Sequence, residues 1–265
     1  MNTANVFSRS LSLEEVRQQS PAVFAASPDE HLSGRYTFIP TDKVLSGLMN
    51  AGFVPVEARQ ARTRRASPLH AVHTVRLRRR YETISLRDSC PEIRLWNSHS
   101  GVGAYQLRMS IWRAVCTNGL IVSKGAFPAV YVPHRGNVVD EVITGALSMA
   151  ERFDVLAAQV ERMETRCLPR DEQLSFAERA LAIRFPDPAR SGLNASQLLT
   201  VRRPEDLADD LYTVLNRVQE NLMRGGLGRR SESGRLTRTR RITSLREDVR
   251  INSQLWDLAR EVLAA

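Results

Sequence analysis

Apolar residues recur at three- and four-residue steps along much of the chain, a spacing that predicts amphipathic helices. A capping box of Ser12 and Glu15 opens a short helix near the N-terminus. Thr41 caps the next helix, and Gly52 ends it because glycine readily takes a left-handed backbone. The same period predicts further helices over residues 103–116, 139–166, 176–185, 204–224 and 253–263.

After Gly52 the period changes to two, which is typical of β-strands with alternate side chains on opposite faces. We expect strands over residues 53–64, 70–80, 92–97, 120–123 and 129–132. In the second strand Val75 and Leu77 point to one face, and three arginines point to the other. The three are Arg76, Arg78 and Arg80, and the preceding strand could extend this basic face through Arg59 and Arg65.

The order of these elements predicts an α+β fold with a mainly antiparallel sheet packed against long helices. Residues 20–33 hold two prolines and many small side chains, so residues 1–33 are interpreted as an N-terminal arm and linker. Residues 34–265 are expected to form a single domain, sheet-rich over 34–135 and helical over 136–265. Within it, residues 225–241 hold four glycines and six arginines, which favours a basic flexible arm before the C-terminal helix.

The positive charge of the chain is concentrated in two stretches. Residues 59–80 hold eight arginines and no acid, and residues 229–250 hold eight arginines against three acids. They carry +8 and +5, which leaves the rest of the chain at −4. A GC-rich genome could explain why thirty-six of the thirty-eight basic residues are arginine, but it does not explain the clustering. Concentrated basic segments on a mildly acidic body indicate a protein that binds phosphate groups.

Arginine suits nucleic acid because its planar fork donates two hydrogen bonds to a phosphate and can also stack on a base. Aromatic side chains such as Tyr81, Trp96 or Tyr105 could stack on unpaired bases. The alternative is a solvated strand face whose arginines pair with carboxylates of the long helices. The expected contacts with a nucleic-acid backbone are Arg76, Arg78, Arg80, Arg59, Arg65, Arg238, Arg240 and Arg241.

A second candidate site is the polar run from Asn97 to Gly101, where a strand is expected to meet a helix. With Cys116 and His134 it could supply a thiol nucleophile and a base. A structural hydrogen bond of His99 and a core position for Cys116 is the favoured interpretation.

Two histidines close in sequence form the third candidate. His70 and His73 are expected on a strand, where residues three apart face opposite sides and cannot hold one metal ion. The sequence also has no nucleotide-binding loop and no paired-carboxylate pattern, so we expect neither a metal nor a cofactor.

The helix around residue 218 interleaves amides and charges: Asn216, Arg217, Gln219, Glu220 and Asn221. This polar side could meet the sheet, bind a partner or face water. Facing water is the simplest interpretation.

Four segments together resemble a known family: residues 95–101, 113–120, 216–226 and 252–256. They resemble the phage- and plasmid-borne proteins grouped as domain of unknown function 932, and the resemblance covers about residues 33–265. It implies the setting of a mobile element, but no established reaction and no catalytic residue. The positions in these segments that form the candidate functional motif are Asn97, His99, Arg113, Asn118, Asn216, Gln219 and Glu220.

Neither a disulfide framework nor a membrane location is expected. Cys90, Cys116 and Cys167 are odd in number and far apart, so they are interpreted as reduced thiols. No apolar run approaches the roughly 18 residues that cross a bilayer, and the first residues lack the features of a signal peptide. We therefore expect a cytoplasmic protein.

These patterns favour a non-enzymatic accessory protein of a mobile element that binds nucleic acid, with single-stranded DNA preferred, in recombination or replication. By analogy with single-strand annealing proteins it could form a homo-oligomer. The alternative is an interaction factor that binds an acidic host protein in defence evasion or element maintenance. A third hypothesis is an enzyme that depends on His99 and Cys116.

Overall fold

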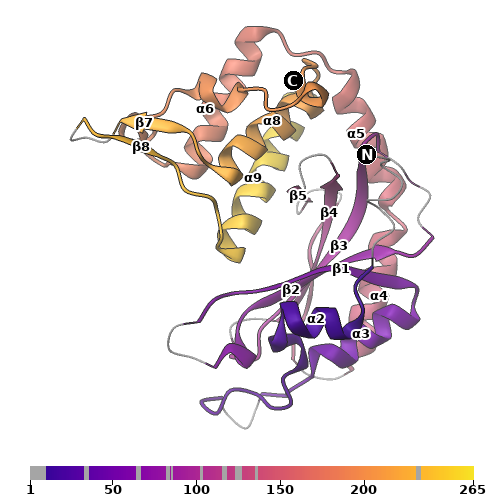
Figure 1. Ribbon diagram of the computed structural model, residues 1–265. Helices are drawn as coiled ribbons and strands as arrows, with labels where there is room; N and C mark the ends of the chain where they lie inside the picture. The colour runs from indigo at the N-terminus through magenta and orange to yellow at the C-terminus, as the bar shows by residue number, and fades with distance from the viewer. Residues whose placement is uncertain are drawn as a thin grey trace. The chain divides into compact units, whose positions relative to one another are not determined.

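The computed structural model of the chain describes residues 10–32, 36–63, 67–81, 84, 86–101, 104–114, 118–122, 127–134, 137–230 and 234–265. It contains helices and antiparallel strands, so the α+β class is confirmed (Figure 1). The chain divides into two compact units. The first comprises Met1–Ala114 and Val122–Leu156, and the second comprises Val115–Ile121 and Ala157–Ala265.

Most strands of an antiparallel sheet lie in the first unit, whereas residues 118–121 of its fifth strand belong to the second. Neighbours in sequence are mostly neighbours in the sheet. The strands are β1 (Phe53–Gln60), β2 (His73–Arg79), β3 (Ser89–Asn97), β4 (Tyr105–Arg113), β5 (Asn118–Val122) and β6 (Val130–Val132). The sheet order is β1-β2-β3-β4-β5, and β6 pairs with β4. Short connections between consecutive strands give this meander directly.

The register separates an apolar face of the sheet from a polar one. Val75 pairs with Leu95 and Leu95 with Leu107, so their side chains share one face. The helices α3 (Thr41–Asn50) and α4 (Val138–Ala150) belong to this apolar side. Gly145 lets α4 approach closely, because a Cβ there would lie 3.0 Å from Val130 Cγ1 and 3.3 Å from Leu107 Cδ1.

The N-terminal segment packs on the sheet in its described part, although residues 1–33 were expected to be an arm and linker. The capping box is confirmed at α2 (Leu13–Gln19), where Ser12 Oγ accepts from the Glu15 amide at 3.1 Å. The Leu11 amide then donates to the Pro55 carbonyl at 2.7 Å, and Gln19 Oε1 accepts from the Ala58 amide of β1 at 3.2 Å. These bonds join the segment to the first unit.

The helix predicted over residues 103–116 is wrong, because the segment forms β4. Leu107 and Ile111 fit a helical stripe, but Tyr105, Leu107, Met109 and Ile111 also alternate at a period of two. Pairing with β3 selects the strand. Asn118 and Gly119, which were expected to end a helix, are instead the first residues of β5. The run Asn97–Gly101 therefore connects two strands.

The remaining elements are mainly helical and contain one hairpin. They are α5 (Phe153–Thr165), α6 (Arg170–Arg184), α7 (Pro188–Ser191), α8 (Leu211–Arg224), β7 (Gly228–Arg230), β8 (Leu236–Arg238), α9 (Leu245–Ala264), and the 3-10 turns η1 (Pro21–Phe24), η2 (Pro68–His70), η3 (Ala195–Leu199) and η4 (Pro204–Asp206). The core of the second unit is α8, in which Val214, Leu215, Val218 and Leu222 are fully buried. No helix within the described ranges is long and apolar enough to cross a membrane.

Several helix bounds differ from the sequence predictions. The helix expected over 139–166 is two helices that break at Glu151 and Arg152, which the continuous apolar stripe does not reveal. Pro204 opens only a 3-10 turn, and α8 starts later, where Asp210 Oδ1 accepts from the Thr213 amide. The last helix begins at Leu245 because Ser244 caps it.

The flexible arm expected over residues 225–241 is wrong for its described part, which forms the hairpin of β7 and β8. At its base the Gly226 amide donates to the Thr239 carbonyl and the Thr239 amide donates to the Leu227 carbonyl, both at 2.9 Å. Gly225, with φ of 67°, lies against the backbone of Arg240. Backbone contacts near residue 225 therefore order a segment whose composition indicates flexibility.

A matched pair of glycine substitutions tests this packing. Both Gly225 and Gly226 have positive φ, but only at Gly225 would a Cβ meet backbone atoms, at 2.7 Å. Gly226→Ala should cost roughly 1–2 kcal/mol of strain, and Gly225→Ala should cost at least about 2 kcal/mol more because the neighbouring backbone must move. Urea denaturation measures both, and equal losses would contradict the packing described.

Candidate functional site

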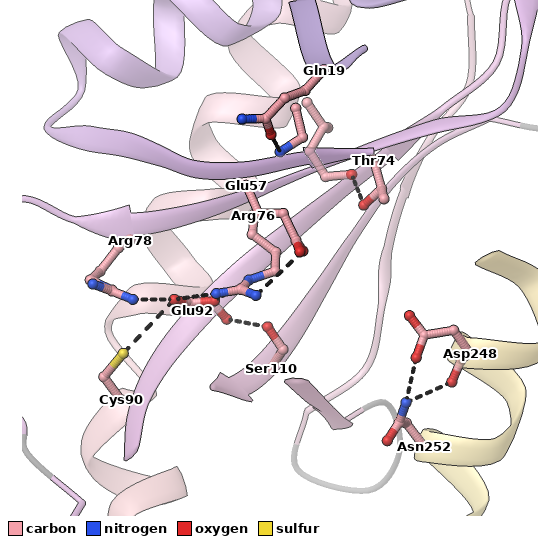
Figure 2. Close-up of polar contacts among 12 residues, drawn as sticks. Gln19, Glu57, Thr74, Arg76, Arg78, Cys90, Glu92, Ser110, Asp248 and Asn252 are labelled. Atoms are coloured by element: carbon pink, nitrogen blue, oxygen red, sulfur yellow. Dashed lines mark hydrogen bonds and ion pairs between the residues drawn. The ribbon is translucent and has the colours of Figure 1, made fainter. Parts of the chain in front are cut away.

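The strand arginines Arg76 and Arg78 lie on the face opposite Val75 and Leu77, as the alternation predicts. They are nevertheless only 6% and 8% exposed, and both contact the fully buried Glu92 of β3. Figure 2 shows the Glu92 carboxylate between the two guanidinium groups. This arrangement is a buried charge cluster.

Glu92 accepts hydrogen bonds from both arginines through its two oxygens. Arg76 Nε donates to Oε2 at 2.7 Å, and Arg78 Nη2 donates to Oε1 at 2.6 Å. Glu57 of β1 adds a longer contact to Arg76 at 3.3 Å. Burial lowers the pKa of Arg76, but attraction to Glu92 and Glu57 outweighs it and raises the pKa above its usual range.

This cluster changes the interpretation of two expected phosphate contacts. Arg76 and Arg78 are locked to Glu92, so as placed they cannot reach a ligand backbone. The carboxylates come from neighbouring strands and not from the long helices. Cys90 on β3 is buried beside them, and burial together with the charge of Glu92 raises the pKa of its thiol to about 12.

The other expected contacts of the first basic stretch differ in exposure. Arg80 is exposed just past the end of β2, together with Arg79 and with Tyr81, whose exposure is 86%. Arg59 is half-buried on β1, and Arg65 lies outside the described residues. Exposed basic side chains therefore gather at the end of β2.

Of the three aromatic residues expected to stack on bases, Tyr81 alone is exposed. Trp96 is 7% exposed, and Tyr105 is fully buried with its hydroxyl donating to the Ile39 carbonyl at 2.7 Å. Stacking by Trp96 and Tyr105 is therefore not supported.

The hairpin of β7 and β8 contains the first part of the second basic stretch, residues 229–250. Gly228 pairs with Arg238 and Arg230 pairs with Leu236, so these four residues share one hairpin face, and all four are exposed. Arg240 and Arg241 follow and are also exposed. Three arginines expected to contact a ligand, Arg238, Arg240 and Arg241, are thus exposed, and Arg230, which was not expected, is exposed on the same face as Arg238.

The base of this hairpin is held by contacts on several sides. Arg184 of α6 donates to the carbonyls of Leu222 and Arg240. Gln197 Nε2 donates to the Gly228 carbonyl at 2.8 Å. Gly192, at φ of 67°, leaves room for the Arg230 carbonyl, which a Cβ would meet at 2.0 Å. The exposed arginines therefore project from a fixed base.

The motif residues Asn97 and His99 belong to a buried network around Thr41. Asn97 Nδ2 donates to Thr41 Oγ1 at 2.9 Å, and the same oxygen lies 2.9 Å from His73 Nε2 and 3.2 Å from His99 Nε2. Tyr105 OH is 3.3 Å away. Neither histidine reaches solvent, since both are at most 1% exposed.

Burial keeps both histidines neutral. It lowers the pKa of His73 to about 4. Burial, followed by repulsion from His73 and His134, lowers the pKa of His99 to about 3. A structural role for His99, the favoured interpretation of the sequence, agrees with this geometry, while the proposed partner Cys116 lies outside the described residues.

Arg113 and Asn118 lie at the ends of adjacent strands. Arg113, 4% exposed, donates through Nε to Asp88 Oδ2 at 2.7 Å and so joins the end of β4 to the turn before β3. Asn118 is the first residue of β5, and its side chain is not described.

The polar side of α8 is buried, so the expectation that it faces water is wrong. Asn216 Nδ2 donates to the Tyr212 carbonyl at 2.8 Å, and Gln219 Nε2 donates to Asn252 Oδ1 at 2.6 Å. Figure 2 shows Asn252 held in turn by Asp248 of α9. The bond of Asn216 lies within α8, and the bond between Gln219 and Asn252 connects α8 and α9.

Glu220 of α8 is paired as well. It accepts hydrogen bonds from Arg203 and, at 2.6 Å, from Arg224 Nη1. Asn216, Gln219 and Glu220 therefore stabilise the second unit from inside. The sequence shows a helix with one apolar and one polar side, which does not reveal that the polar side is also buried, where its polar groups need hydrogen-bond partners.

Metal-binding geometry is not found in the part of the chain that the structure covers. There, no three side chains of the ligand types His, Cys, Asp and Glu come together around one point. His70 lies in η2 and contacts Asp29, with 3.5 Å between Nδ1 and Oδ2, whereas His73 starts β2 in the core.

Comparison with known proteins identifies relatives over nearly the whole chain. The family described as "Domain of unknown function (DUF932)" matches residues 29–256. Two proteins of Escherichia coli (strain K12), "UPF0380 protein YafZ" and "UPF0380 protein YfjQ", are each 38% identical over 256 residues, which is 96% of this chain and 92% of theirs. No solved structure gives a significant match.

Substitution of Glu92 tests the buried charge cluster. Glu92→Gln leaves two buried guanidinium groups without their shared carboxylate, and loss of a buried partner costs about 3–5 kcal/mol. Glu57→Gln is the matched control, because the Glu57 side chain is 37% exposed and its contact is longer, so it should cost less than about 1 kcal/mol. Urea denaturation compares the two, and equal losses would show that Glu92 does not hold the cluster.

The buried histidines predict a loss of stability in mild acid. In the unfolded chain a histidine titrates near pH 6.5, whereas the pKa values of folded His73 and His99 are about 4 and about 3. Below about pH 6.5 the unfolded state therefore binds protons that the folded state does not, and the free energy of unfolding falls.

The measurement is the urea midpoint at about pH 7.5 and about pH 5. His73→Gln should show a smaller drop than the parent, while His31→Gln, at an exposed position, should keep the parent's drop. An unchanged drop in His73→Gln would refute the assignment.

Proposed function

The chain belongs to the DUF932 family, whose description names no ligand, and from its own geometry we propose that it binds nucleic acid, with single-stranded DNA preferred. The observation that supports this most directly is the exposed arginine set on the hairpin: Arg230, Arg238, Arg240 and Arg241. We call this set the hairpin arginines.

The hairpin arginines are available to a ligand. Within the described residues their side chains make no ion pair, in contrast to Arg76 and Arg78. No carboxylate of the described residues neutralises these side chains, which supports binding of an external anion. A guanidinium group binds phosphate through two parallel hydrogen bonds, which makes phosphodiester a matching ligand.

The fixed base of the hairpin strengthens the proposal. A flexible basic arm loses conformational freedom when it binds, and this loss reduces affinity. Here the bonds of Arg184, Gln197 and Thr239 fix the backbone before a ligand arrives, so mainly the arginine side chains remain to be ordered.

The preference for single strands is supported by the end of β2. Arg79, Arg80 and the exposed Tyr81 follow one another there. An arginine beside an exposed aromatic ring offers a phosphate contact and a surface for an unpaired base. A duplex keeps its bases stacked and gains little from such a ring.

We also propose that the protein acts on the DNA of a mobile element, in recombination or replication.

Binding of an acidic host protein is the second candidate, since the same exposed charge would attract acidic side chains. A guanidinium group binds carboxylate as well as phosphate through two hydrogen bonds, so the two candidates are separated by experiment. A Cys/His enzyme gains no support, because His99 is buried with a pKa of about 3.

Replacement of the hairpin arginines tests the proposal. The variant Arg230→Ala/Arg238→Ala/Arg240→Ala/Arg241→Ala should bind single-stranded DNA at least about tenfold more weakly at low salt. The slope of log affinity against log salt should become less steep by about 3, because four phosphate contacts on a single strand release counterions at about 0.7 each. Fluorescence anisotropy with single-stranded and duplex oligonucleotides across a salt series measures both.

The control removes four exposed arginines elsewhere: Arg17→Ala/Arg152→Ala/Arg162→Ala/Arg170→Ala. It lowers the net charge by the same amount and should keep most of the affinity and slope. If both quadruple variants lose affinity equally, binding depends on net charge alone. If the parent binds no oligonucleotide but captures an acidic protein, the second candidate takes its place.

A further inference from the structure

An exposed tyrosine that is not among the residues expected to bind a ligand lies on the polar face of the sheet. Tyr131 is on the short strand β6 and is 58% exposed. It pairs with Gln106 of β4, so the two side chains share a face. Because its side chain is largely exposed on a short strand, Tyr131 does not contribute to the apolar core.

Arg108 of β4 holds this tyrosine in place. Its Nη2 donates to Tyr131 OH at 2.9 Å and to Gln106 Oε1 at 3.1 Å. Its guanidinium carbon lies 5.7 Å from the centre of the Tyr131 ring. Arg108, itself held by Gln106, therefore orients the ring, while more than half of the tyrosine's surface remains open to solvent.

The surroundings of Tyr131 are positively charged. The register places Arg76 opposite Arg94 and Arg94 opposite Arg108, a row of guanidinium groups across β2, β3 and β4. Along the described strands, the carboxylates on this face are Glu57 and Glu92, and their ion pairs are with Arg76 and Arg78. Arg76 and Arg94 are buried, at 6% and 4% exposure, so the charge that a ligand can reach beside Tyr131 is that of Arg108. Arg108 makes no ion pair among the described residues, and its positive charge suits an anionic ligand.

We infer that Tyr131, Arg108 and Gln106 bind one unpaired nucleotide of a single strand, an inference that rests on the proposed function. The base stacks on the Tyr131 ring, and Arg108 contacts the adjacent phosphate through its remaining N–H donors. The Gln106 amide group lies beside the ring, where it can hydrogen-bond to the edge of a stacked base. A base paired within a duplex presents no free ring face to Tyr131.

Substitutions at Tyr131 test the inference. Tyr131→Ala should weaken binding of a single-stranded oligonucleotide about five- to fiftyfold by anisotropy, since stacking on one aromatic ring has an effect of this size. Tyr131→Phe keeps the ring and should stay within about threefold of the parent. Duplex binding should be the same in all three proteins. Val155→Ala, at another exposed position, is the control.

A second readout reports stacking directly. An oligonucleotide that contains 2-aminopurine loses fluorescence when this base stacks, so the parent and Tyr131→Phe should quench it and Tyr131→Ala should not. Circular dichroism of the variants checks the fold.

The outcomes separate this inference from the proposed function. If Tyr131→Ala binds and quenches like the parent while the hairpin quadruple variant does not bind, the inference fails and the proposed function stands. If Tyr131→Ala loses single-stranded and duplex binding alike, the residue does not select unpaired bases and the inference also fails. If the parent binds no oligonucleotide, both fail.

Discussion

The carboxylate of Glu92 is the interaction on which the organisation of the sheet depends. It is fully buried and lies between two arginines that are themselves less than a tenth exposed. An isolated guanidinium group at such a position would be strongly destabilising, whereas a paired and hydrogen-bonded one is tolerated. The pairing also requires one register of β2 against β3, because a slip of one residue would move Glu92 to the apolar face.

The same pairing decides where charge is available. It neutralises the arginines nearest the middle of the sheet and leaves exposed charge at the end of β2, near Tyr131 on β6, and on the hairpin of the second unit. Clustering in the sequence is therefore a poor guide to a surface, since Arg76 and Arg80 belong to the same cluster and differ completely in exposure. What matters is whether a carboxylate on the adjacent strand can reach the arginine.

The sequence was sufficient to predict the fold class, most of the strands, and the alternation that places Val75 and Arg76 on opposite faces of the sheet. It was not sufficient for β4, because Leu107 and Ile111 satisfy a helical and a strand period at once and only pairing with β3 decides. It also did not predict the partner of Arg76, since Glu92 is a long-range neighbour that appears only when the register is known. The ordered hairpin was missed for a related reason, because its stability comes from Arg184 and Gln197, which are distant in sequence.

The candidate site residues divide by physical environment. The motif residues that carry the family resemblance, such as Asn97, His99 and Glu220, are buried and hydrogen-bonded. In this chain they stabilise the fold, so the candidate functional motif does not present an evident chemistry. The exposed arginines and tyrosines lie mostly outside that motif.

Under the proposed function, the hairpin arginines and Tyr131 contribute to affinity in different ways. Contacts between arginine and phosphate release counterions, so their share of the binding free energy falls steeply as salt rises. A base stacked on an aromatic ring adds to the binding free energy without neutralising a charge, so its share depends much less on salt. A protein that uses both kinds of contact therefore keeps part of its affinity for an unpaired strand at a salt concentration where purely electrostatic binding is lost.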